Sequence, residues 1–137
     1  MTLAVFDASV VVKWYIATDP FFDAALQARD EYEAAAPTLM QAEVANALWK
    51  YIRAGVMNLE DACEGVAVLE DLIALSPDSE LLGPALRLSG QLDHPVYDCV
   101  YLAMAQRRAL PLITADRRLA EQARGLELAV KFIGSES

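Results

Sequence analysis

The sequence predicts an α/β protein of three layers, α/β/α, in which helices cover both faces of a small, mainly parallel central sheet. Short apolar runs alternate with longer segments of helical periodicity, the pattern of strand–helix–strand units. Hydrophobic residues make up 55% of the chain, enough for a buried core. A length of 137 residues suits a single domain over residues 1–137, because two domains of half that size would each bury too little surface.

The first third of the chain predicts strands and helices in alternation. Residues 3–6 are a continuous apolar run, as in a strand buried on both faces. A short helix is expected over residues 10–16, and an Asp-Pro break separates it from a second helix over residues 21–33. Residues 34–36 are ambiguous and are compatible with a short strand.

The next two helices have recognisable starts. One is expected from Thr38 to about Arg53, with Thr38 and Gln41 as a capping box and Gly55 as its stop. Asn58 caps the other, whose apolar residues recur every three or four positions and predict one buried face. These apolar residues are Leu59, Ala62, Cys63, Val66, Leu69 and Ile73.

The second half continues the alternation. We expect an extended piece at residues 73–75, followed by helices at residues 80–92 and 96–109. A strand at residues 111–114, a helix at residues 117–124 and a last strand at residues 130–133 complete the pattern.

Composition excludes several classes of protein. No apolar run reaches the ~18 residues of a membrane span, and Asp7 interrupts the first apolar run, unlike in a signal peptide. Cys63 and Cys99 lie in apolar helical contexts, which predicts buried thiols in a reducing, cytoplasmic environment. The net charge of −9 excludes a basic nucleic-acid-binding protein. The acids form either a solubilising surface or, in part, a cation-binding cluster.

Two acids follow predicted strands. Asp7 and Asp116 each lie where a strand ends and a helix begins, and Thr114 precedes the second acid by two residues. The carboxyl ends of parallel strands are where such folds bind ligands. Both aspartates also suit helix N-caps, and Thr114 could cap a helix or bind a ligand oxygen.

Two further acids lie on predicted helices. Asp98 is the single charged residue from Pro95 to Ala105, and a lone buried carboxylate is costly unless paired or bound to a metal. The alternative is a first-turn acid that the helix dipole stabilises. Glu43 shares a helix arc with polar residues, so it belongs either to a solvated stripe or to the same crevice as the aspartates.

If the four acids converge, a divalent cation is their natural compensation, because neighbouring carboxylates repel one another. Carboxylates and water suit Mg²⁺ or Mn²⁺. The single histidine, His94, is expected to start a helix rather than bind a metal, which argues against a zinc site or a Ser-His-Asp triad. Ser9 stands where a haloacid-dehalogenase-type phosphotransferase needs a second acid, and a receiver domain would need a lysine that Thr114-Ala115-Asp116 lacks.

Four short motifs occur in a fixed order between residue 3 and about residue 133. They are Phe6-Asp7-Ala8-Ser9, Glu43 with Asn46-Ala47-Leu48, Tyr97-Asp98 with Tyr101-Leu102-Ala103, and Thr114-Ala115-Asp116 with Leu119. Together they resemble the PIN domain, and more narrowly the VapC-type toxin ribonucleases of bacterial and archaeal toxin–antitoxin pairs.

The resemblance implies a PIN-like fold and a Mg²⁺- or Mn²⁺-dependent endoribonuclease. The implied partners are an RNA substrate, a small antitoxin protein and a second copy of the chain. By position, the acidic quartet is Asp7, Glu43, Asp98 and Asp116, with Thr114 as its Ser/Thr and with Ser9 and Asn46 at accessory polar positions. Asp7, Asp98 and Asp116 would hold the metal, and Glu43 would be a further ligand or the base that orients water. The alternative is a catalytically inactive PIN-fold protein that only binds RNA or a protein partner.

Two other sets of residues admit two interpretations each. The arginines of the C-terminal segment either flank an RNA-binding cleft or serve surface solubility and helix ends; they are Arg107, Arg108, Arg117, Arg118 and Arg124. Four aromatic residues either pack in the core or a dimer interface, or line an apolar groove for a partner helix. They are Trp14, Tyr15, Trp49 and Tyr51.

Overall fold

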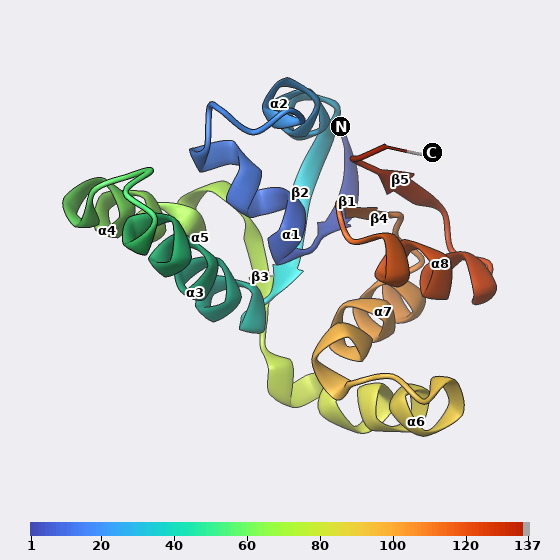
Figure 1. Ribbon diagram of the computed structural model, residues 1–137. Coiled ribbons are helices and arrows are strands. Elements are labelled where there is room, and N and C mark those ends of the chain that lie inside the picture. The colour runs from blue at the N-terminus through green and yellow to red at the C-terminus, as the bar shows by residue number, and fades with distance from the viewer. Residues whose placement is uncertain (136–137) are drawn as a thin grey trace.

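A computed structural model describes residues 1–135, and its centre is a five-stranded sheet in which every pair of neighbouring strands is parallel (Figure 1). The strand order is β3-β2-β1-β4-β5. The strands are β1 (Thr2–Phe6), β2 (Tyr32–Pro37), β3 (Ala74–Ser76), β4 (Leu112–Thr114) and β5 (Val130–Phe132).

Helices cover both faces of this sheet, which confirms the predicted α/β/α class. Helix α7 packs against β1, β2 and β4 (Figure 1). Helix α2 packs against β2, and helix α8 packs against β4 and β5. The α-helices are α1 (Ala8–Val11), α2 (Phe22–Glu31), α3 (Leu39–Arg53), α4 (Leu59–Ala67), α5 (Leu69–Leu72), α6 (Leu82–Leu92), α7 (Val96–Arg108) and α8 (Arg117–Gly125). Two 3₁₀ helices, η1 and η2, span Val12–Tyr15 and Asp78–Glu80.

The order of the strands explains the apolar run at the start of the chain. Strand β1 lies at the centre and pairs with β2 on one side and β4 on the other. Its residues Ala4, Val5 and Phe6 are completely buried. A central strand covered on both faces has no solvent-facing positions, so its sequence does not alternate between apolar and polar residues.

The same order creates a switch point in the sheet. From β1 the chain first builds β2 and β3 on one side, and it later crosses to β4 on the other side of β1. Ligands of open α/β sheets bind outside the carboxyl ends of the strands that flank such a point. These ends are Phe6 in β1 and Thr114 in β4.

The predicted capping box at Thr38 is wrong. The Leu39 amide donates to Asp78 Oδ1 at 2.9 Å, and Thr38 Oγ1 accepts from the Asp78 amide at 3.3 Å. The start of α3 is therefore capped by a carboxylate 39 positions further along the chain, and not by its own third residue.

Two other local predictions also need correction. The helix predicted over residues 21–33 ends at Glu31, because Tyr32 and the residues after it pair with β1 as strand β2. On α4, Ala62 is buried, but Leu59 is 58% exposed and Cys63 is also exposed. The apolar face of α4 is thus only partly covered. Among residues 1–135, no helix is long and apolar enough to cross a membrane.

Candidate active site

Asp7 lies directly after β1, and its side chain does two things at once. It caps α1, since the Ser9 amide donates to Oδ2 at 3.3 Å and the Ser9 hydroxyl donates to Oδ1 at 2.7 Å. It also lies at the carboxyl edge of the sheet and is only 5% exposed. The capping role and a role in a site are therefore compatible at this residue.

Hydroxyl groups connect the end of β1 to the end of β4. The Ser9 and Thr114 hydroxyl oxygens are 3.3 Å apart, and the Ala115 amide donates to Ser9 Oγ at 2.9 Å. The Asp116 amide donates to Thr114 Oγ1 at 3.0 Å. Asp116 itself caps α8, accepting from the Leu119 amide at 3.0 Å. Asp7, Ser9, Thr114 and Asp116 thus form one connected group, here called the strand-end group.

The electrostatics of the strand-end group are unfavourable without a counter-charge. Burial raises the pKa of the Asp7 carboxyl from 3.8 to about 7, and the negative charge of Asp116 adds to the increase. Hydrogen bonds from Ser9 and Thr114 to the carboxylate act in the opposite direction. A buried acid whose pKa is strongly perturbed at a cleft is typical of a functional site.

Glu43 is held from α7 rather than by its own helix. The phenol of Tyr101 donates to Glu43 Oε1 at 2.5 Å, and the Tyr101 side chain is buried. Burial raises the pKa of Glu43, the hydrogen bond from Tyr101 opposes this, and the charges of Asp98 and Asp78 raise it further. This half-buried glutamate is not part of a solvated stripe.

Asp98 is not the lone buried carboxylate that the sequence suggests. Its side chain is 30% exposed, and its Oδ2 lies 2.7 Å from Nε2 of His94. His94 lies just before α7, as predicted, and its buried ring contacts Asp98, so it belongs to the site although the sequence does not predict it there. The signal in the sequence is the spacing of four residues between the histidine and the aspartate, which lets the two side chains meet at the start of α7. Glu43, Tyr101, Asp98 and His94 are called the helix-borne group below.

Among the four predicted acids, electrostatic effects on the pKa connect two pairs. The charge of Asp116 acts on Asp7, and the charge of Asp98 acts on Glu43. The pKa of Tyr101 is raised far above its usual range, mainly by burial and then by the charges of Glu43 and Asp7, so this phenol links the two pairs.

The donor set suits a hydrated ion better than a closed protein cage. Within the described part of the chain, no three His, Cys, Asp or Glu side chains are grouped closely enough to hold a metal by themselves. Mg²⁺ usually keeps several waters and takes only one or two carboxylates from the protein. Two pairs of carboxylates, each with one member whose pKa is raised, fit that requirement.

A groove of about 380 Å³ continues outward from Glu43. It is lined by residues of α3 and by one residue of α7: Leu39, Ala42, Glu43, Asn46, Ala47, Lys50 and Tyr97. Asn46, predicted at an accessory position, is exposed and lines this groove. The arginines at the end of α7 lie elsewhere, because nine residues of helix, about 14 Å, separate Asp98 from Arg107.

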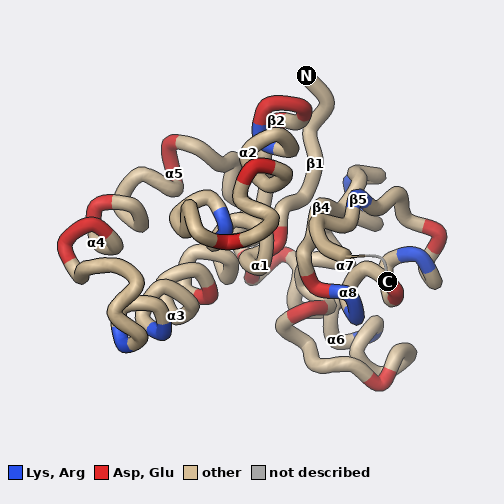
Figure 2. The backbone as a smooth tube through the Cα atoms, turned by 45° about the horizontal axis from the view of Figure 1, so that its top comes forward, with Lys and Arg blue, Asp and Glu red and all other residues tan. Residues whose placement is uncertain are grey.

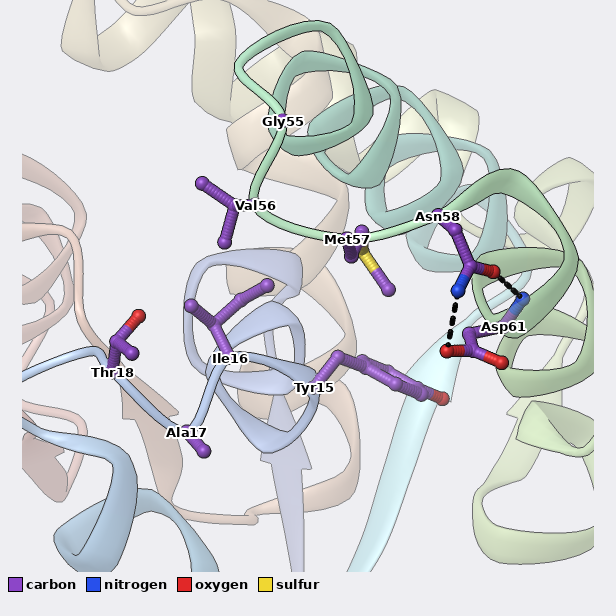
Figure 3. A pocket seen from close by; sticks show the side chains of 9 residues that line it. All are labelled: Tyr15, Ile16, Ala17, Thr18, Gly55, Val56, Met57, Asn58 and Asp61. Atoms are coloured by element: carbon purple, nitrogen blue, oxygen red, sulfur yellow. Dashed lines mark hydrogen bonds between the residues drawn. The ribbon is translucent and has the colours of Figure 1, made fainter.

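Another cavity, of about 630 Å³, lies away from the four acids (Figure 3). It is bounded by residues 15–18 and by the turn that carries Gly55 to Asn58. Asn58 caps α4 as predicted, accepting from the Asp61 amide at 2.8 Å, and Asn58 and Asp61 face each other at one end of the cavity in Figure 3. This cavity contains no member of either acidic group.

The fold and its acidic edge define a class, namely α/β proteins that gather carboxylates at the switch point of a short parallel sheet. A model of the PIN domain matches residues 4–125. The chain belongs to the PIN domain family.

Individual relatives agree with this assignment. Ribonuclease VapC3 of Pyrobaculum aerophilum is 31% identical over 124 residues, which cover 86% of this chain and 92% of the relative. The crystal structure of PAE2754 from the same organism has a TM-score of 0.69 at 26% identity and covers 94% and 83% of the two chains.

More distant solved structures share the fold. Mycobacterium tuberculosis VapC20, described as a Sarcin-Ricin loop cleaving toxin, has a TM-score of 0.71 at 12% identity, with coverage of 88% of this chain and 94% of that one. A toxin–antitoxin complex from Klebsiella pneumoniae has a TM-score of 0.63 at 20% identity, with coverage of 82% and 86%.

Proposed function

We propose that this protein is a divalent-metal-dependent endoribonuclease and the toxin of a type II toxin–antitoxin pair, acting in the cytoplasm. The observation that carries the proposal is the coupling of Asp7 with Asp116 and of Glu43 with Asp98 beside the switch point of the sheet. Family membership and the VapC ribonuclease relative support it.

Asp7, Asp98 and Asp116 would hold Mg²⁺ or Mn²⁺, directly or through water. A bound divalent ion supplies charge compensation for a phosphodiester and lowers the pKa of coordinated water. Glu43 is the residue suited to take the proton of the attacking water, because its raised pKa makes it a stronger base than an ordinary glutamate. The water attacks phosphorus in line with the leaving 3′ oxygen, which leaves a 5′-phosphate and a 3′-hydroxyl.

Thr114 and Ser9 have a supporting role in this scheme. Their hydroxyls hold the ends of β1 and β4 at a fixed separation, and Ser9 also donates to Asp7. We expect them to orient the strand-end carboxylates rather than to react.

The bound RNA strand would extend from the acidic centre along the groove beside Glu43. Tyr97 presents an exposed ring there, and Lys50 provides a positive charge on the same wall. Aromatic rings stack on unpaired bases, and lysines contact phosphates. With a net charge of −9 the protein gains little from general attraction, so recognition of a particular RNA shape is expected.

The antitoxin would dock in an apolar groove of about 400 Å³ between α3 and α4. The groove is lined by Ala45, Leu48, Trp49, Ile52, Leu59, Ala62, Cys63, Val66 and Ala67. Trp49 is 50% exposed and lines this groove, whereas Trp14 is buried in the core. Helices α4 and α5 carry acids and no lysine or arginine, which favours an amphipathic partner helix with basic flanks (Figure 2).

A calorimetric Mn²⁺ titration at near-neutral pH, with Asp98→Asn beside the wild type, tests the metal site before any RNA target is known. Saturable binding that the substitution weakens is the expected result. Equal behaviour of the two proteins would contradict a shared metal site. Cleavage of RNA by the wild type and not by the variant then separates the nuclease from the alternative, an inactive PIN-fold protein. The resemblance also implies that two copies of the chain associate, and sedimentation of the purified protein tests this homodimer.

A further inference from the structure

We propose that His94 is a positioning residue: its Nε2–H holds Oδ2 of Asp98 and so presents the other carboxylate oxygen to the acidic centre. The metal-binding consequence rests on the proposed function, whereas the hydrogen bond itself does not. The histidine acts through Asp98 and is not expected to touch RNA.

The contact between the two side chains is short and asymmetric in its exposure. Nε2 of His94 lies 2.7 Å from Oδ2 of Asp98. The imidazole is 1% exposed and the aspartate side chain 30% exposed. The buried ring therefore lies behind the carboxylate, which faces the solvent-accessible side of the site.

The surroundings of the ring identify the donor. An ionised carboxylate only accepts hydrogen bonds, so Nε2 must carry the proton that the two atoms share. Nδ1 is buried and has no hydrogen-bond partner among residues 1–135. A buried N–H without a partner is costly, so the lower-energy arrangement has a proton on Nε2 and none on Nδ1.

The backbone around His94 limits the movement of the ring. The Ser89 hydroxyl donates to the His94 carbonyl at 2.5 Å, and the His94 amide donates to the Ser89 carbonyl at 3.3 Å. The Cys99 thiol also faces the His94 carbonyl, at 3.8 Å. Asp93 ends α6 in the left-handed conformation, with φ of 52°, and Pro95 follows the histidine. These contacts fix the end of α6 relative to the start of α7, and with it the direction of the imidazole.

A fixed carboxylate matters because Asp98 is in the first turn of α7 and, within the described part of the chain, no hydroxyl donates to it as Ser9 does to Asp7. Without His94 its side chain could rotate among several conformers. Residues that orient a metal-binding side chain change metal affinity by about 10- to 100-fold when they are removed.

The first test is the tautomer of His94, which needs neither metal nor RNA. The chain has one histidine. A long-range ¹H–¹⁵N spectrum of the protein, prepared without a histidine tag, therefore contains imidazole signals from this ring alone. We expect the pattern of a ring protonated at Nε2, and a change of the Nε2 signals in Asp98→Asn. A ring protonated at Nδ1, or signals that ignore the substitution, would overturn the proposal.

The second test is Mn²⁺ affinity measured by calorimetry in a pair of matched variants. His94→Leu fills the space but removes the donor, and we expect affinity to fall about 10-fold. His94→Gln keeps an N–H near the position of Nε2, and we expect it to restore most of that loss. Ser89→Ala is the control, since it loosens the same turn without removing the donor. Thermal unfolding of all variants separates loss of affinity from loss of the fold.

The outcomes distinguish this inference from the proposed function. If the wild type binds Mn²⁺ and His94→Leu binds it equally well, the positioning role is wrong and the metal site stands. Equal losses in His94→Leu, His94→Gln and Ser89→Ala would identify a purely structural turn and also overturn the role. If the wild type does not bind Mn²⁺, the metal-dependent function fails and the positioning role with it.

Discussion

The strand-end group and the helix-borne group place acids at the same edge of the sheet in different ways. Asp7 and Asp116 are held by backbone amides and by hydroxyls two or three residues away, after adjacent strands. Among residues 1–135, the side chain of Glu43 pairs with the phenol of Tyr101, 58 positions away, and that of Asp98 with the imidazole of His94, just before α7.

The difference follows from the geometry of the two kinds of element. At the end of a strand the turn into a helix exposes unpaired amides, which a short acid can accept from. Glu43 lies in the second turn of α3, where the amides are already bonded within the helix, so this acid needs a side chain from elsewhere. We therefore expect the strand-end group to tolerate loss of one hydrogen bond better than the helix-borne group does.

The largest expected effect comes from neutralising an acid in either group. Asp7→Asn and Asp98→Asn should each lower RNA cleavage by at least about 100-fold, because each removes charge that compensates the ion in the transition state. Single-turnover cleavage of a responsive RNA is the measurement. Glu33→Gln, an exposed acid on β2, is the control. Full activity in either aspartate variant would remove that residue from the site.

The buried charge of Asp7 should appear in the pH dependence of stability. Its pKa is higher in the folded protein, about 7, than its ordinary value of 3.8. The folded state thus binds the proton more tightly, and stability contributed by protonated Asp7 is lost as the pH rises through this window. The loss is at most about 4 kcal/mol.

Denaturant unfolding between pH 4 and pH 7 in a chelator, compared with Asp7→Asn, isolates this contribution. In a plot of the free energy of unfolding against pH, the variant should lack the part of the slope that comes from residue 7. Added Mn²⁺ should restore stability to the wild type near neutral pH. Parallel slopes in the two proteins would show that Asp7 does not titrate in this range.

The Tyr101 phenol gives a smaller and more specific test of the helix-borne group. Tyr101→Phe keeps the ring but leaves Glu43 without its partner, so we expect a fall in cleavage of about 10-fold. In the wild type the hydrogen bond from Tyr101 lowers the pKa of Glu43, so its loss should raise that pKa. The acidic limb of the pH–rate profile should therefore move to higher pH.

A double-mutant cycle with Glu43→Gln shows whether the two residues act together. Additive losses would mean that Tyr101 does not act through the glutamate. Equal loss in Ser9→Ala and Tyr101→Phe would remove the proposed difference in tolerance between the two groups.

The smallest expected effect concerns the cap of α3, the helix that carries Glu43. Asp78→Ala should lower the free energy of unfolding by about 1 kcal/mol, because the Leu39 amide loses its acceptor. The neighbouring exposed residue gives the control Ser79→Ala, which should have no effect. If Gln41→Ala is the more damaging substitution in denaturant unfolding, the local capping box is the true cap.

Much of this molecule is determined by short-range patterns in its sequence. The apolar run before Asp7 and that before Thr114 predict buried strands, and their carboxyl ends do meet beside the switch point. Caps such as Asn58 are also local and were predicted correctly. A short sequence window contains the physical causes in these cases, namely periodicity and the unpaired amides of a helix start.

The tertiary structure alone decided which distant groups meet. The distant partners, Tyr101 for Glu43 and Asp78 for the start of α3, come from sequence positions that no periodicity connects. His94 showed a suggestive spacing, but whether its ring is buried behind Asp98 depends on how α6 and α7 pack together. Cys63 became exposed for the converse reason, since α4 has no further element to cover its outer apolar face among the described residues. Local propensity determines that a helix or strand forms, whereas burial and pairing depend on neighbours that are distant in the chain.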